Sequence, residues 1–543
     1  MEHKLKSLKH EIVLFTVTGL LLFTGLDKIE VNIMEARNFI SAREMVQNKE
    51  YFLTTLNNEP RYQKPPLPTW LTAISGTLFG FDSLYAMRLP VVAITFLLVF
   101  SFYYFSKLIG LSSKYSFNNA LILITSFYIF FAGRDNQWDM YTHSFMMVCI
   151  YFLWKLFRED SRELRNSILA GVCFGLSFLS KGPISLYVLL LPFLVSYSIV
   201  YHFSLRKKIL YLLNVFLIGL SVGLSWYIYV NLKDPEYFRM TVTRETSNWA
   251  SYEVKPFYYY WNFFIQSGLW TIPSLTALIY PYLKKRVENL KAYRFVVLWT
   301  ILSVIFLSCI PEKKVRYLVP VLIPLALTTG FYIEYLMQNF SKITDKKEKI
   351  WTFFSFGFTA LIGFLYPFIV VFLLKESIKG YLPLFILSSL LMYVFSFFII
   401  RGLIDRNFRR IFNSMISIFV LIVITLVPVR GKIFPNPDFA PAREAQIIEN
   451  QFNIKTYRLS DIAPEIVWNF GKSIPLLQNK EDQLSLPSEP IFALIADKSD
   501  SVVLKNRFIN YKIEKKYIIN MNYGIKNKVR YLKDYYLLTK KVE

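Results

Sequence analysis

Cysteine and histidine are scarce in this chain of 543 residues, which contains three Cys and four His. The cysteines lie within or at the ends of apolar segments, where cysteine behaves as a small buried hydrophobe; they are Cys149, Cys173 and Cys309. This placement argues against a disulfide framework and against a cysteine-based zinc site. No histidine has a second ligand beside it at the spacing of a metal site, so the sequence indicates no required cofactor.

The chain also lacks a Gly-rich phosphate loop, a nucleotide-binding fingerprint and a Ser-His-Asp arrangement. Acidic residues are too few to balance the basic ones, since 38 Asp and Glu face 62 Lys and Arg, for a formal net charge of +24. Such an excess can indicate nucleic-acid binding, but a polybasic rim beside anionic lipid headgroups accounts for most of it. We therefore expect membrane lipids, and no nucleic acid, among the partners.

Apolar residues are abundant instead. They make up 54% of the chain, aromatic residues make up 18%, and the mean hydropathy is +0.36. They fall in runs of about 20 residues, the length at which a helix crosses a hydrocarbon core of ~30 Å. The candidate spans are 12–30, 86–106, 116–133, 139–157, 167–181, 184–202, 209–231, 261–283, 292–311, 316–338, 350–374, 380–400 and 411–429. These runs predict an α-helical polytopic membrane protein with about 13 transmembrane helices.

The orientation of the spans follows from the distribution of Lys and Arg. If the N-terminus is cytoplasmic, the cytoplasmic connections carry most of the basic residues, in agreement with the positive-inside rule. An odd number of spans then places the C-terminal segment on the opposite face. We therefore expect a multi-pass membrane protein with a cytoplasmic N-terminus and a C-terminal segment on the outer face of the membrane.

Three outer stretches interrupt the apolar pattern. The first outer loop, about 31–85, contains a helical pattern over 32–50 that is typical of a helix lying on the membrane surface. The second, 232–260, contains Arg239, Arg244, Glu245, Asn248 and Trp249. The third predicts a soluble α/β domain over 431–543, so the transmembrane domain is 1–430. Its expected strands are 455–459 and 491–496, its expected helices are near 441–451 and 464–470, and 511–519 is rich in β-forming residues.

Glu35 follows the first span closely and has Arg37 beside it. One interpretation is an interfacial carboxylate that anchors the surface helix by pairing with Arg37 or Lys64. The other is a general base, or a hydrogen-bond anchor for an incoming acceptor. A membrane-proximal site of reduced dielectric would raise the pKa of such a carboxyl group toward a useful range.

Asp139 begins the fourth span, five residues after Arg134 and four after Asp135. Two acids four residues apart share a face if this turn is helical. They are either solvated loop residues or functional groups, because an acid at the lip of an apolar helix is costly. Since Asp139 is the deeper of the two, we favour it as the functional one.

A cluster of cations between the ninth and tenth spans departs from the positive-inside pattern; it consists of Lys313, Lys314 and Arg316, with Tyr317 next to them. It is either a basic loop or a clamp for phosphate, for which Arg offers a planar fork and Lys a mobile charge. Lys64 and Lys181 are two further outer cations next to prolines. A divalent metal remains possible through Glu35 and Asp139.

The motifs around these residues resemble the GT-C membrane glycosyltransferases, in particular the bacterial group of lipid A aminoarabinose transferases and protein O-mannosyltransferase relatives. The resemblance covers residues 1–430 in order and span number, and the C-terminal domain only in general character. It rests on Glu35–Met45, Asn57–Pro66 with Arg61, Tyr62 and Lys64, Arg134 with Asp139, Ser180–Pro183, Trp226–Tyr227, and Lys313–Tyr317 with Pro320.

The resemblance implies a thirteen-span fold, a polyprenyl-phosphate sugar donor, and a first-loop acid near the reaction centre. It also implies a second acid at Asp139 and a Lys-Pro-Pro lysine, Lys64, near the donor phosphate. Two positions depart from the family pattern. Met34-Glu35 stands where Asp-Glu is usual, so Glu35 would take over the role of the acid, and Gln63 stands where a Glu is usual, which weakens a metal site there.

The resemblance, together with these residues, predicts an enzyme of the bacterial inner (plasma) membrane whose active site and C-terminal domain are periplasmic. It would move a monosaccharide from a polyprenyl-phosphate donor to a cell-envelope acceptor, lipid A or a related glycolipid. Glu35 and Asp139 would be catalytic, and the donor phosphate would bind Lys64, Arg37, Lys313, Lys314, Arg316 and Tyr317, with Arg61, Tyr62, Arg134 and Lys181 nearby. Transfer to protein Ser or Thr is the alternative within this class. A transporter or flippase is the alternative outside it, although a transporter would place its charges near the membrane midplane.

Overall fold

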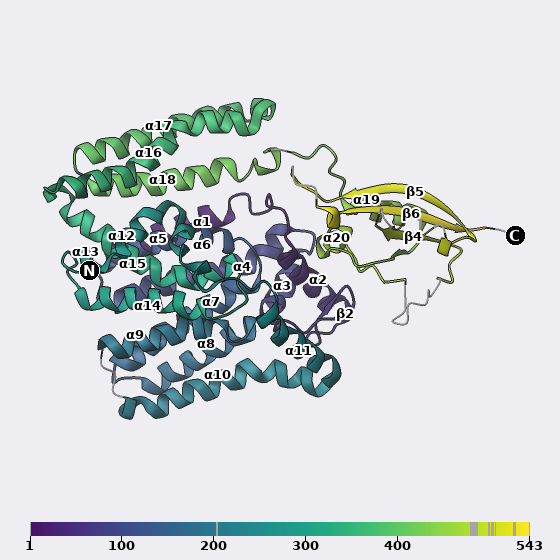
Figure 1. Ribbon diagram of the computed structural model, residues 1–543, viewed down its shortest axis with the longest axis horizontal. Coiled ribbons are helices and arrows are strands. Elements are labelled where there is room, and N and C mark those ends of the chain that lie inside the picture. Colours follow the sequence, from purple (N-terminus) through teal and green to yellow (C-terminus); the bar gives the residue numbers. More distant parts are fainter. Residues whose placement is uncertain are drawn as a thin grey trace.

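The apolar segments of the sequence form a large body of helices, and a small α/β domain lies at one end of it (Figure 1). The computed structural model describes residues 2–201, 205–433, 435–477, 487–497, 500, 504, 506–524 and 528–541. The helices of the body run roughly side by side along the long axis of the molecule, and the N-terminus lies at the end opposite the C-terminal domain (Figure 1).

Most of the body consists of long helices. They are α1 (Glu2–Phe23), α4 (Leu84–Leu108), α5 (Ser113–Ile124), α7 (Trp138–Arg158), α8 (Glu163–Lys181), α9 (Leu191–Tyr201), α10 (Leu205–Lys233), α14 (Leu290–Ser308), α15 (Val319–Asn339), α16 (Lys346–Leu374), α17 (Leu382–Ile404) and α18 (Phe408–Leu426). Shorter helical segments lie between them, namely α6 (Phe127–Ala132), the π-helix η1 (Leu186–Leu190), η3 (Phe263–Trp270), α12 (Thr271–Leu278), α13 (Tyr280–Leu283), η5 (Phe340–Lys342) and η6 (Lys375–Tyr381).

Seven helices in the described part of the chain are long and apolar enough to cross a membrane. They lie in α4, α10, α14, α15, α16, α17 and α18, and each coincides with a predicted span. The remaining predicted spans fall on helices that are shorter, interrupted or more polar. A multi-span membrane protein is therefore confirmed, and the number thirteen stays a prediction.

Two predicted spans are not continuous helices. The span 116–133 is divided into α5 and α6, and the hydroxyl of Thr125 at the break accepts a hydrogen bond from Trp270 Nε1 at 2.9 Å. The span 261–283 contains η3, α12 and α13 in succession, and η3 is itself kinked at Gly268, whose φ of 61° lies in the left-handed region that favours glycine. A Cβ at Gly268 would lie 2.2 Å from the Phe127 ring. The prediction of one continuous helix for each of these two spans was wrong, because apolar composition alone does not reveal where a helix is interrupted.

Close packing of α8 against α10 depends on glycines at four-residue spacing. Gly171 and Gly175 on α8 face α10, and Gly219 and Gly223 on α10 face α8. A Cβ at Gly219 would lie 1.9 Å from the Phe174 side chain. Such small-residue stripes let two helix backbones approach closely in a membrane, where dispersion replaces the hydrophobic effect as the driving force.

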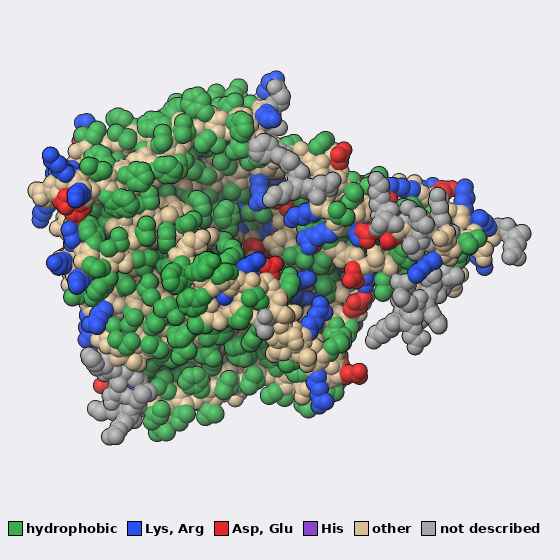
Figure 2. Space-filling model, in the orientation of Figure 1, with side chains coloured by type: hydrophobic (Ala, Val, Ile, Leu, Met, Phe, Trp, Pro, Cys, Tyr) green, Lys and Arg blue, Asp and Glu red, His purple; other side chains and the backbone are tan. Residues whose placement is uncertain are grey.

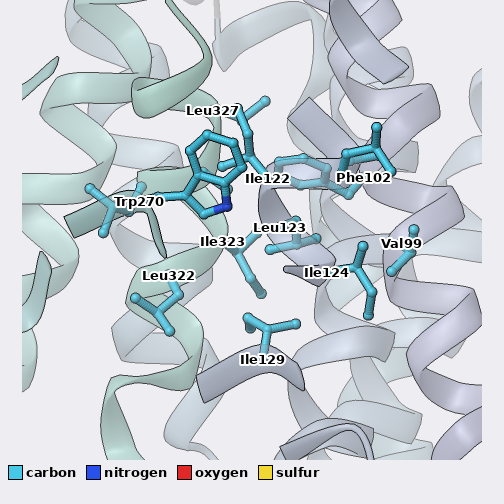
Figure 3. Packing of buried hydrophobic residues seen from close by; sticks show 14 of the residues in the cluster. Val99, Phe102, Ile122, Leu123, Ile124, Ile129, Trp270, Leu322, Ile323 and Leu327 are labelled. Atoms are coloured by element: carbon cyan, nitrogen blue, oxygen red, sulfur yellow. The ribbon is translucent and has the colours of Figure 1, made fainter. Parts of the chain in front are cut away.

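The centre of the body is a dry, close-packed core. Figure 3 shows side chains from α4, α5, α6 and α15 meeting around Trp270, among them Phe102, Ile122 and Ile323. These side chains are fully or almost fully buried. Burial of this kind fixes the relative positions of the helices, because interiors of this density tolerate little displacement.

The surface of the body is a broad apolar belt. Figure 2 shows it in green, with Lys and Arg gathered along the end that carries the N-terminus and further charges where the body meets the C-terminal domain. On α16 and α17 many large side chains are exposed, among them Phe354, Phe358, Phe368, Leu387 and Phe397. An exposed apolar surface of this extent is typical of helices that face lipid.

The first outer loop forms α2 (Ile33–Asn48), the hairpin strands β1 (Thr55–Leu56) and β2 (Glu59–Pro60), and α3 (Leu67–Phe79). The helix expected over 32–50 is present, but its position on an open membrane surface was wrong. Most of α2 is buried, because the C-terminal domain covers it: Phe39 packs on Trp468, and Arg43 lies over the same ring at 5.5 Å. The helix therefore joins the two parts of the protein.

The C-terminal domain is a four-stranded mixed sheet with the order β3-β4-β6-β5. Its elements are η7 (Arg430–Lys432), α19 (Ala442–Phe452), β3 (Thr456–Arg458), α20 (Pro464–Phe470), β4 (Ile491–Ala496), β5 (Tyr511–Asn520), η9 (Val529–Tyr531) and β6 (Leu532–Lys540). β3 pairs parallel to β4, and β6 pairs antiparallel to both β4 and β5. The expected strands and helices of this domain are all present, and β6 was not predicted.

Candidate functional site: a basic cavity beneath the C-terminal domain

A cavity of about 620 Å³ opens where the first outer loop, the end of α8, the helix α11 (Pro235–Ser251) and the loop before α15 meet. We call it the basic cavity, because seven cationic side chains line it: Arg37, Arg61, Lys64, Lys181, Arg244, Lys314 and Arg316. Its acids are Glu59, Glu245 and Glu312, and its tyrosines are Tyr187, Tyr237, Tyr252 and Tyr317. Basic groups thus exceed acidic ones in its wall.

The cations come from five separate segments of the chain. Arg37 lies on α2, Arg61 and Lys64 follow the hairpin strand β2, and Lys181 is the last residue of α8. Arg244 lies on α11, which begins with a proline after the N-cap Asp234; the Asp234 side chain accepts a hydrogen bond from Tyr237 N at 3.3 Å. Lys314 and Arg316 flank the start of η4 (Val315–Leu318).

The loop that carries Lys314 and Arg316 is fixed by backbone contacts. Val254 and Glu312 form an antiparallel bridge, and Lys313 N donates to Glu253 O at 3.1 Å. Tyr260, in η2 (Phe257–Tyr260), accepts from Lys314 N at 2.9 Å and donates to Lys314 O at 3.1 Å. The aromatic run before α12 therefore holds this basic loop in place.

Only part of the positive charge is neutralised inside the protein. Lys64 Nζ lies 3.3 Å from Glu245, and Lys314 Nζ lies 2.5 Å from Glu312, which also accepts from Tyr317 OH at 3.1 Å. Within the described part of the chain, no acid lies within ion-pair distance of the remaining lining arginines; they are Arg37, Arg61, Arg244 and Arg316. Four guanidinium groups without a carboxylate partner form a site for an anion, because Arg presents a planar fork to phosphate oxygens.

Burial makes this charge costly. Arg61 is 8% exposed, and its guanidinium lies 5.3 Å from the Trp138 ring. Burial, together with repulsion from Arg37, lowers the pKa of Arg61 to about 9. Burial also lowers the pKa of Arg37. An anion in the basic cavity would relieve this repulsion, since an opposite charge nearby favours the charged form of both groups.

Lys181 connects the cavity to Asp139. The Lys181 ammonium forms a short ion pair with Asp139, and both side chains are buried. Lys181 Nζ also lies 5.0 Å from the Tyr317 ring. Behind the pair, His143 Nε2 is 4.0 Å from Asp139 Oδ1, and His143 Nδ1 is 2.6 Å from Ser185 Oγ. Asp139 therefore does not line the basic cavity itself; it orients the lysine that does.

Glu35 lies behind the cavity wall as well. It is 1% exposed, and its two oxygens accept from Arg88 Nε and Nη2, each at 2.7 Å. Its Oε1 also accepts from Asn136 N at 3.0 Å. Arg88 in turn donates to Leu26 O and Ile29 O at 2.6 and 2.9 Å. The Glu35 carboxylate thus ties three segments together, and both of its oxygens are bound by Arg88.

Asp135 lies close to Glu35. Its Oδ1 accepts from Asn32 Nδ2 at 2.9 Å, and its Oδ2 accepts from Gln137 Nε2 at 2.5 Å. Burial and repulsion from Glu35 raise the pKa of Asp135 to about 8. The carboxyl group is thus mostly protonated at neutral pH, unlike an ordinary surface aspartate.

Several predicted site residues lie outside the cavity wall and have other partners. Arg134 donates to Leu21 O and Thr24 O at 2.6 Å each, next to the end of α1. Tyr62 donates to Asp234 Oδ2 at 3.0 Å, and Lys313 donates to Ile310 O at 2.5 Å. These three side chains hold the backbone around the cavity. By contrast, Arg37, Arg61, Lys64, Lys181, Lys314, Arg316 and Tyr317 come together in its wall.

Two important side chains were missed from the sequence. Arg244 was noted in the second outer stretch, but no role was predicted for it. It is far from the other cations along the chain, so the sequence does not show that they lie together in the cavity wall. Arg88 lies inside an apolar span, and such a charge is itself a signal, because an unpaired charge in a membrane helix is costly.

For a metal, no group of three or more His, Cys, Asp or Glu side chains with suitable geometry occurs among the described residues.

Comparison with known proteins identifies relatives of this chain. Residues 63–227 match the family described as dolichyl-phosphate-mannose-protein mannosyltransferase. The undecaprenyl phosphate-alpha-4-amino-4-deoxy-L-arabinose arabinosyl transferase of Photorhabdus laumondii is 24% identical over 306 residues, which cover 54% of this chain and 53% of that protein. A transferase of the same description from Proteus mirabilis is 25% identical over 334 residues, 60% of each protein. The chain thus spans little more than half the length of these relatives.

Solved structures extend the likeness to nearly the whole chain. The crystal structure of ArnT from Cupriavidus metallidurans in the apo state covers 99% of this chain and 98% of its own, with a TM-score of 0.69 and 15% identity. The same protein bound to undecaprenyl phosphate gives a TM-score of 0.69, 14% identity and 97% coverage of each chain. The predicted fold class, a helical membrane protein with a small C-terminal α/β domain, is confirmed, as is the resemblance to the membrane glycosyltransferases.

Proposed function

We propose that this protein is a membrane glycosyltransferase that moves a monosaccharide from a polyprenyl-phosphate donor to a lipid acceptor, lipid A or a related glycolipid. The observation that carries the proposal is the set of unpaired arginines in the basic cavity, at one end of a body that has a broad apolar belt. A donor of this kind has an anionic phosphate and a hydrophobic tail, and therefore matches both features. The likeness to undecaprenyl-phosphate-dependent transferases agrees with it.

The phosphate would lie among Arg61, Arg316 and Lys64. As the bond from the anomeric carbon to the phosphate oxygen breaks, negative charge grows on the leaving phosphate. Cations that are already in place stabilise that charge more than they stabilise the bound donor, which lowers the barrier. Lys64 can leave Glu245 for this purpose, because the ion pair is weak: it is partly exposed, and its N–O distance of 3.3 Å is long for a charge-assisted hydrogen bond.

The remaining predicted residues would act through these cations. Asp139 would hold Lys181 in the cavity wall, and Tyr317 would hold the loop of Lys314 through Glu312. Glu35 would be a positioning residue, since its carboxylate is bound to Arg88 on both oxygens. Direct displacement would invert the anomeric centre, and an anionic phosphate acceptor would need no general base.

A hydroxyl acceptor, such as a protein Ser or Thr, is the second candidate function, because the mannosyltransferase family matches residues 63–227. Such an acceptor must lose a proton during transfer, so a carboxylate that can take it is required. In the basic cavity, Glu245 and Glu312 are already paired with Lys64 and Lys314. Asp135 lies behind the cavity wall, and burial and repulsion from Glu35 raise its pKa to about 8. The phosphate acceptor is therefore favoured.

The protein would lie in the bacterial inner membrane with its N-terminus in the cytoplasm. This orientation is supported by the distribution of Lys and Arg, which is strongest along the end of the body that carries the N-terminus (Figure 2). The basic cavity and the C-terminal domain of residues 431–543 would then face the periplasm, and residues 1–430 would form the transmembrane domain. No sugar nucleotide is available on that side, which agrees with a lipid-linked donor.

The test is a transfer reaction with purified protein. Polyprenyl-phosphate sugars are extracted from membranes and supplied together with lipid A in detergent, and the products are identified by mass spectrometry. The expected result is lipid A heavier by one monosaccharide residue, with release of polyprenyl phosphate. If lipid A is unmodified while an added peptide gains the sugar, the protein acceptor is correct; if neither changes with any donor, the proposed function is wrong.

A further inference from the structure

A smaller cavity, of about 310 Å³, lies at the end of the helical body opposite the basic cavity. Its wall is formed by the connection from α4 to α5, the connection from α13 to α14, and the last turns of α15. Because α15 begins next to the loop of Lys314 and Arg316, its last turns lie at the far end, which also carries the N-terminus (Figure 1). We call this cavity the acidic pocket, after Glu288 and Glu334 in its wall.

The charge that remains in the acidic pocket is negative. Its one lining cation, Arg286, is already neutralised: Arg286 Nε lies 3.5 Å from Glu348 Oε1 on α16, and the guanidinium stacks over the Tyr282 ring at 4.1 Å. Glu288 and Glu334 have no Lys or Arg within ion-pair distance in the described part of the chain. Two carboxylates thus stay without a cation at an end of the body where Lys and Arg otherwise gather (Figure 2).

Glu334 is only half satisfied by hydrogen bonds. Its Oε1 accepts from Gln338 Nε2 at 3.2 Å, one turn further along α15. Its other oxygen, Oε2, is buried and has no hydrogen-bond partner among the residues that the structure describes. A buried carboxylate oxygen without a donor is costly. A donor from outside the chain would remove that cost.

Tyr115 on α5 supplies a second, independent observation. It lines the acidic pocket, is 7% exposed, and its hydroxyl has no partner within the described ranges either. Its ring packs edge-on against Phe331, another lining residue, with 5.6 Å between the ring centroids. The hydroxyl also interacts electrostatically with both Glu334 and Glu288. Two unsatisfied polar groups from different helices therefore meet at one pocket.

The chemistry of these groups selects the ligand. An anion would be repelled by the two carboxylates. A divalent metal needs more ligands than they offer, and the described residues contain no group of three or more His, Cys, Asp or Glu that could hold one. An ammonium group carries a positive charge and up to three N–H donors, so it can serve a carboxylate and a hydroxyl oxygen together.

We propose that the acidic pocket binds a primary ammonium group. The ammonium donates to Glu334 Oε2 and to the Tyr115 hydroxyl, and Glu288 balances its charge from the rim. An ethanolamine lipid headgroup and a soluble amine share this chemistry. The bound group joins α5, α15 and the connection before α14, and it therefore stabilises the helical body at the end away from the basic cavity. This site is independent of the transfer reaction.

The experiment measures binding to the full-length purified protein in detergent. Phosphatidylethanolamine and phosphatidylglycerol are compared by native mass spectrometry, and spermidine is titrated by calorimetry. Glu334→Gln removes the charge and keeps the shape, whereas Tyr115→Phe removes only the hydroxyl and keeps the ring against Phe331. Asp405→Asn is the matched control, because Asp405 is an exposed acid at the same end of the body, pairs with Arg410 and does not line the pocket. Thermal unfolding without added ligand reports whether each variant is folded.

Wild-type protein is expected to bind phosphatidylethanolamine more tightly than phosphatidylglycerol. Glu334→Gln should weaken phosphatidylethanolamine binding about tenfold and Tyr115→Phe about threefold, with Asp405→Asn unchanged. If the two variants weaken spermidine binding and leave the lipid unaffected, the ammonium comes from a soluble amine. Unchanged binding of both amines in folded Tyr115→Phe and Glu334→Gln would overturn the proposal. An equal loss of phosphatidylglycerol, which has no ammonium group, would overturn it as well.

Discussion

Arg88 donates hydrogen bonds to both oxygens of the Glu35 carboxylate: Nε donates to Oε1 and Nη2 donates to Oε2, each at 2.7 Å. Both side chains are about 1% exposed. The pair joins α4 to the start of α2, whose Met34 and Arg37 line the basic cavity. Its geometry is the bidentate form in which Arg binds carboxylates most strongly. The first-loop acid thus serves the site by fixing the position of α2.

We predict that Arg88→Met strongly destabilises the protein, by about 3–5 kcal/mol, because it leaves the Glu35 carboxylate buried without a partner. Thermal unfolding in detergent, followed by intrinsic fluorescence, measures the effect. The double variant Glu35→Leu with Arg88→Met removes both charges and is expected to be more stable than Arg88→Met alone. A double variant that folds and still transfers sugar would agree with a positioning role for Glu35, whereas one that folds but is fully inactive would point to catalysis by its carboxylate.

Arg316→Ala and Lys64→Ala are each expected to weaken undecaprenyl phosphate binding. A hydrogen bond to a charged group contributes about 1.5–3 kcal/mol, which corresponds to about 10- to 100-fold in the dissociation constant. The measurement is a titration of the detergent-solubilised variants with undecaprenyl phosphate. Lys255→Ala is the control for a change of net charge, because Lys255 is exposed, pairs with Glu253 and does not line the basic cavity. Equal losses in all three variants would contradict a specific phosphate site.

The convergence of these cations was not predictable from the sequence, although their unusual location was. Lys181, Lys314 and Arg316 stand in short outer connections where the positive-inside rule disfavours Lys and Arg, so their presence there indicates a function other than setting the topology. Which cations face the cavity was not predictable. Lys313 and Lys314 are adjacent in the sequence, but their side chains have different partners: Lys313 donates to the carbonyl of Ile310, whereas Lys314 lines the cavity. That difference is set by the turn between α14 and η4.

The placement of the acids was harder to predict. An acid near a membrane face satisfies the same sequence pattern whether it is free or paired, and the partner of Glu35 lies 53 positions away on α4. Asp139 was preferred over Asp135 because it is deeper in the span. That same depth brings Asp139 next to Lys181, with which it pairs, so it does not line the basic cavity. Most helices and strands of the C-terminal domain were predictable from its short apolar stretches, whereas β6 and the order of the strands in the sheet were not.

The pH dependence of transfer separates the two acceptor chemistries. With a phosphate acceptor, kcat/KM is expected to be flat from about pH 6 to about pH 8, because no proton has to be removed. It should fall above about pH 9, since Arg61, whose pKa is lowered to about 9, then loses the charge that attracts the donor. With a hydroxyl acceptor the rate would instead rise through about pH 8, as Asp135 ionises. A rise of this kind that Asp135→Asn abolishes would contradict the phosphate acceptor.

Arg458 links the C-terminal domain to the hairpin beside the basic cavity. Arg458 on β3 is 4% exposed, forms a short ion pair with Glu59 and donates to Ile474 O at 3.1 Å. Glu59 belongs to the hairpin that leads to Arg61, and Asn57 in the same turn is bonded to Ile474 on both sides, at 2.7 and 2.8 Å. The hairpin is therefore held between α2 and the C-terminal domain.

We expect Arg458→Ala to raise the KM for the lipid-linked donor several-fold with a smaller change in kcat, because the hairpin that presents Arg61 gains freedom while the other cations stay in place. Initial rates at varied donor concentration measure this effect, and limited proteolysis reports whether the hairpin is cleaved faster. Lys455→Ala provides the control, since Lys455 precedes the same strand but its side chain is 71% exposed and pairs with Glu489. If Arg458→Ala lowers kcat alone, or if Lys455→Ala has the same effect, the C-terminal domain does not act on donor binding through this contact.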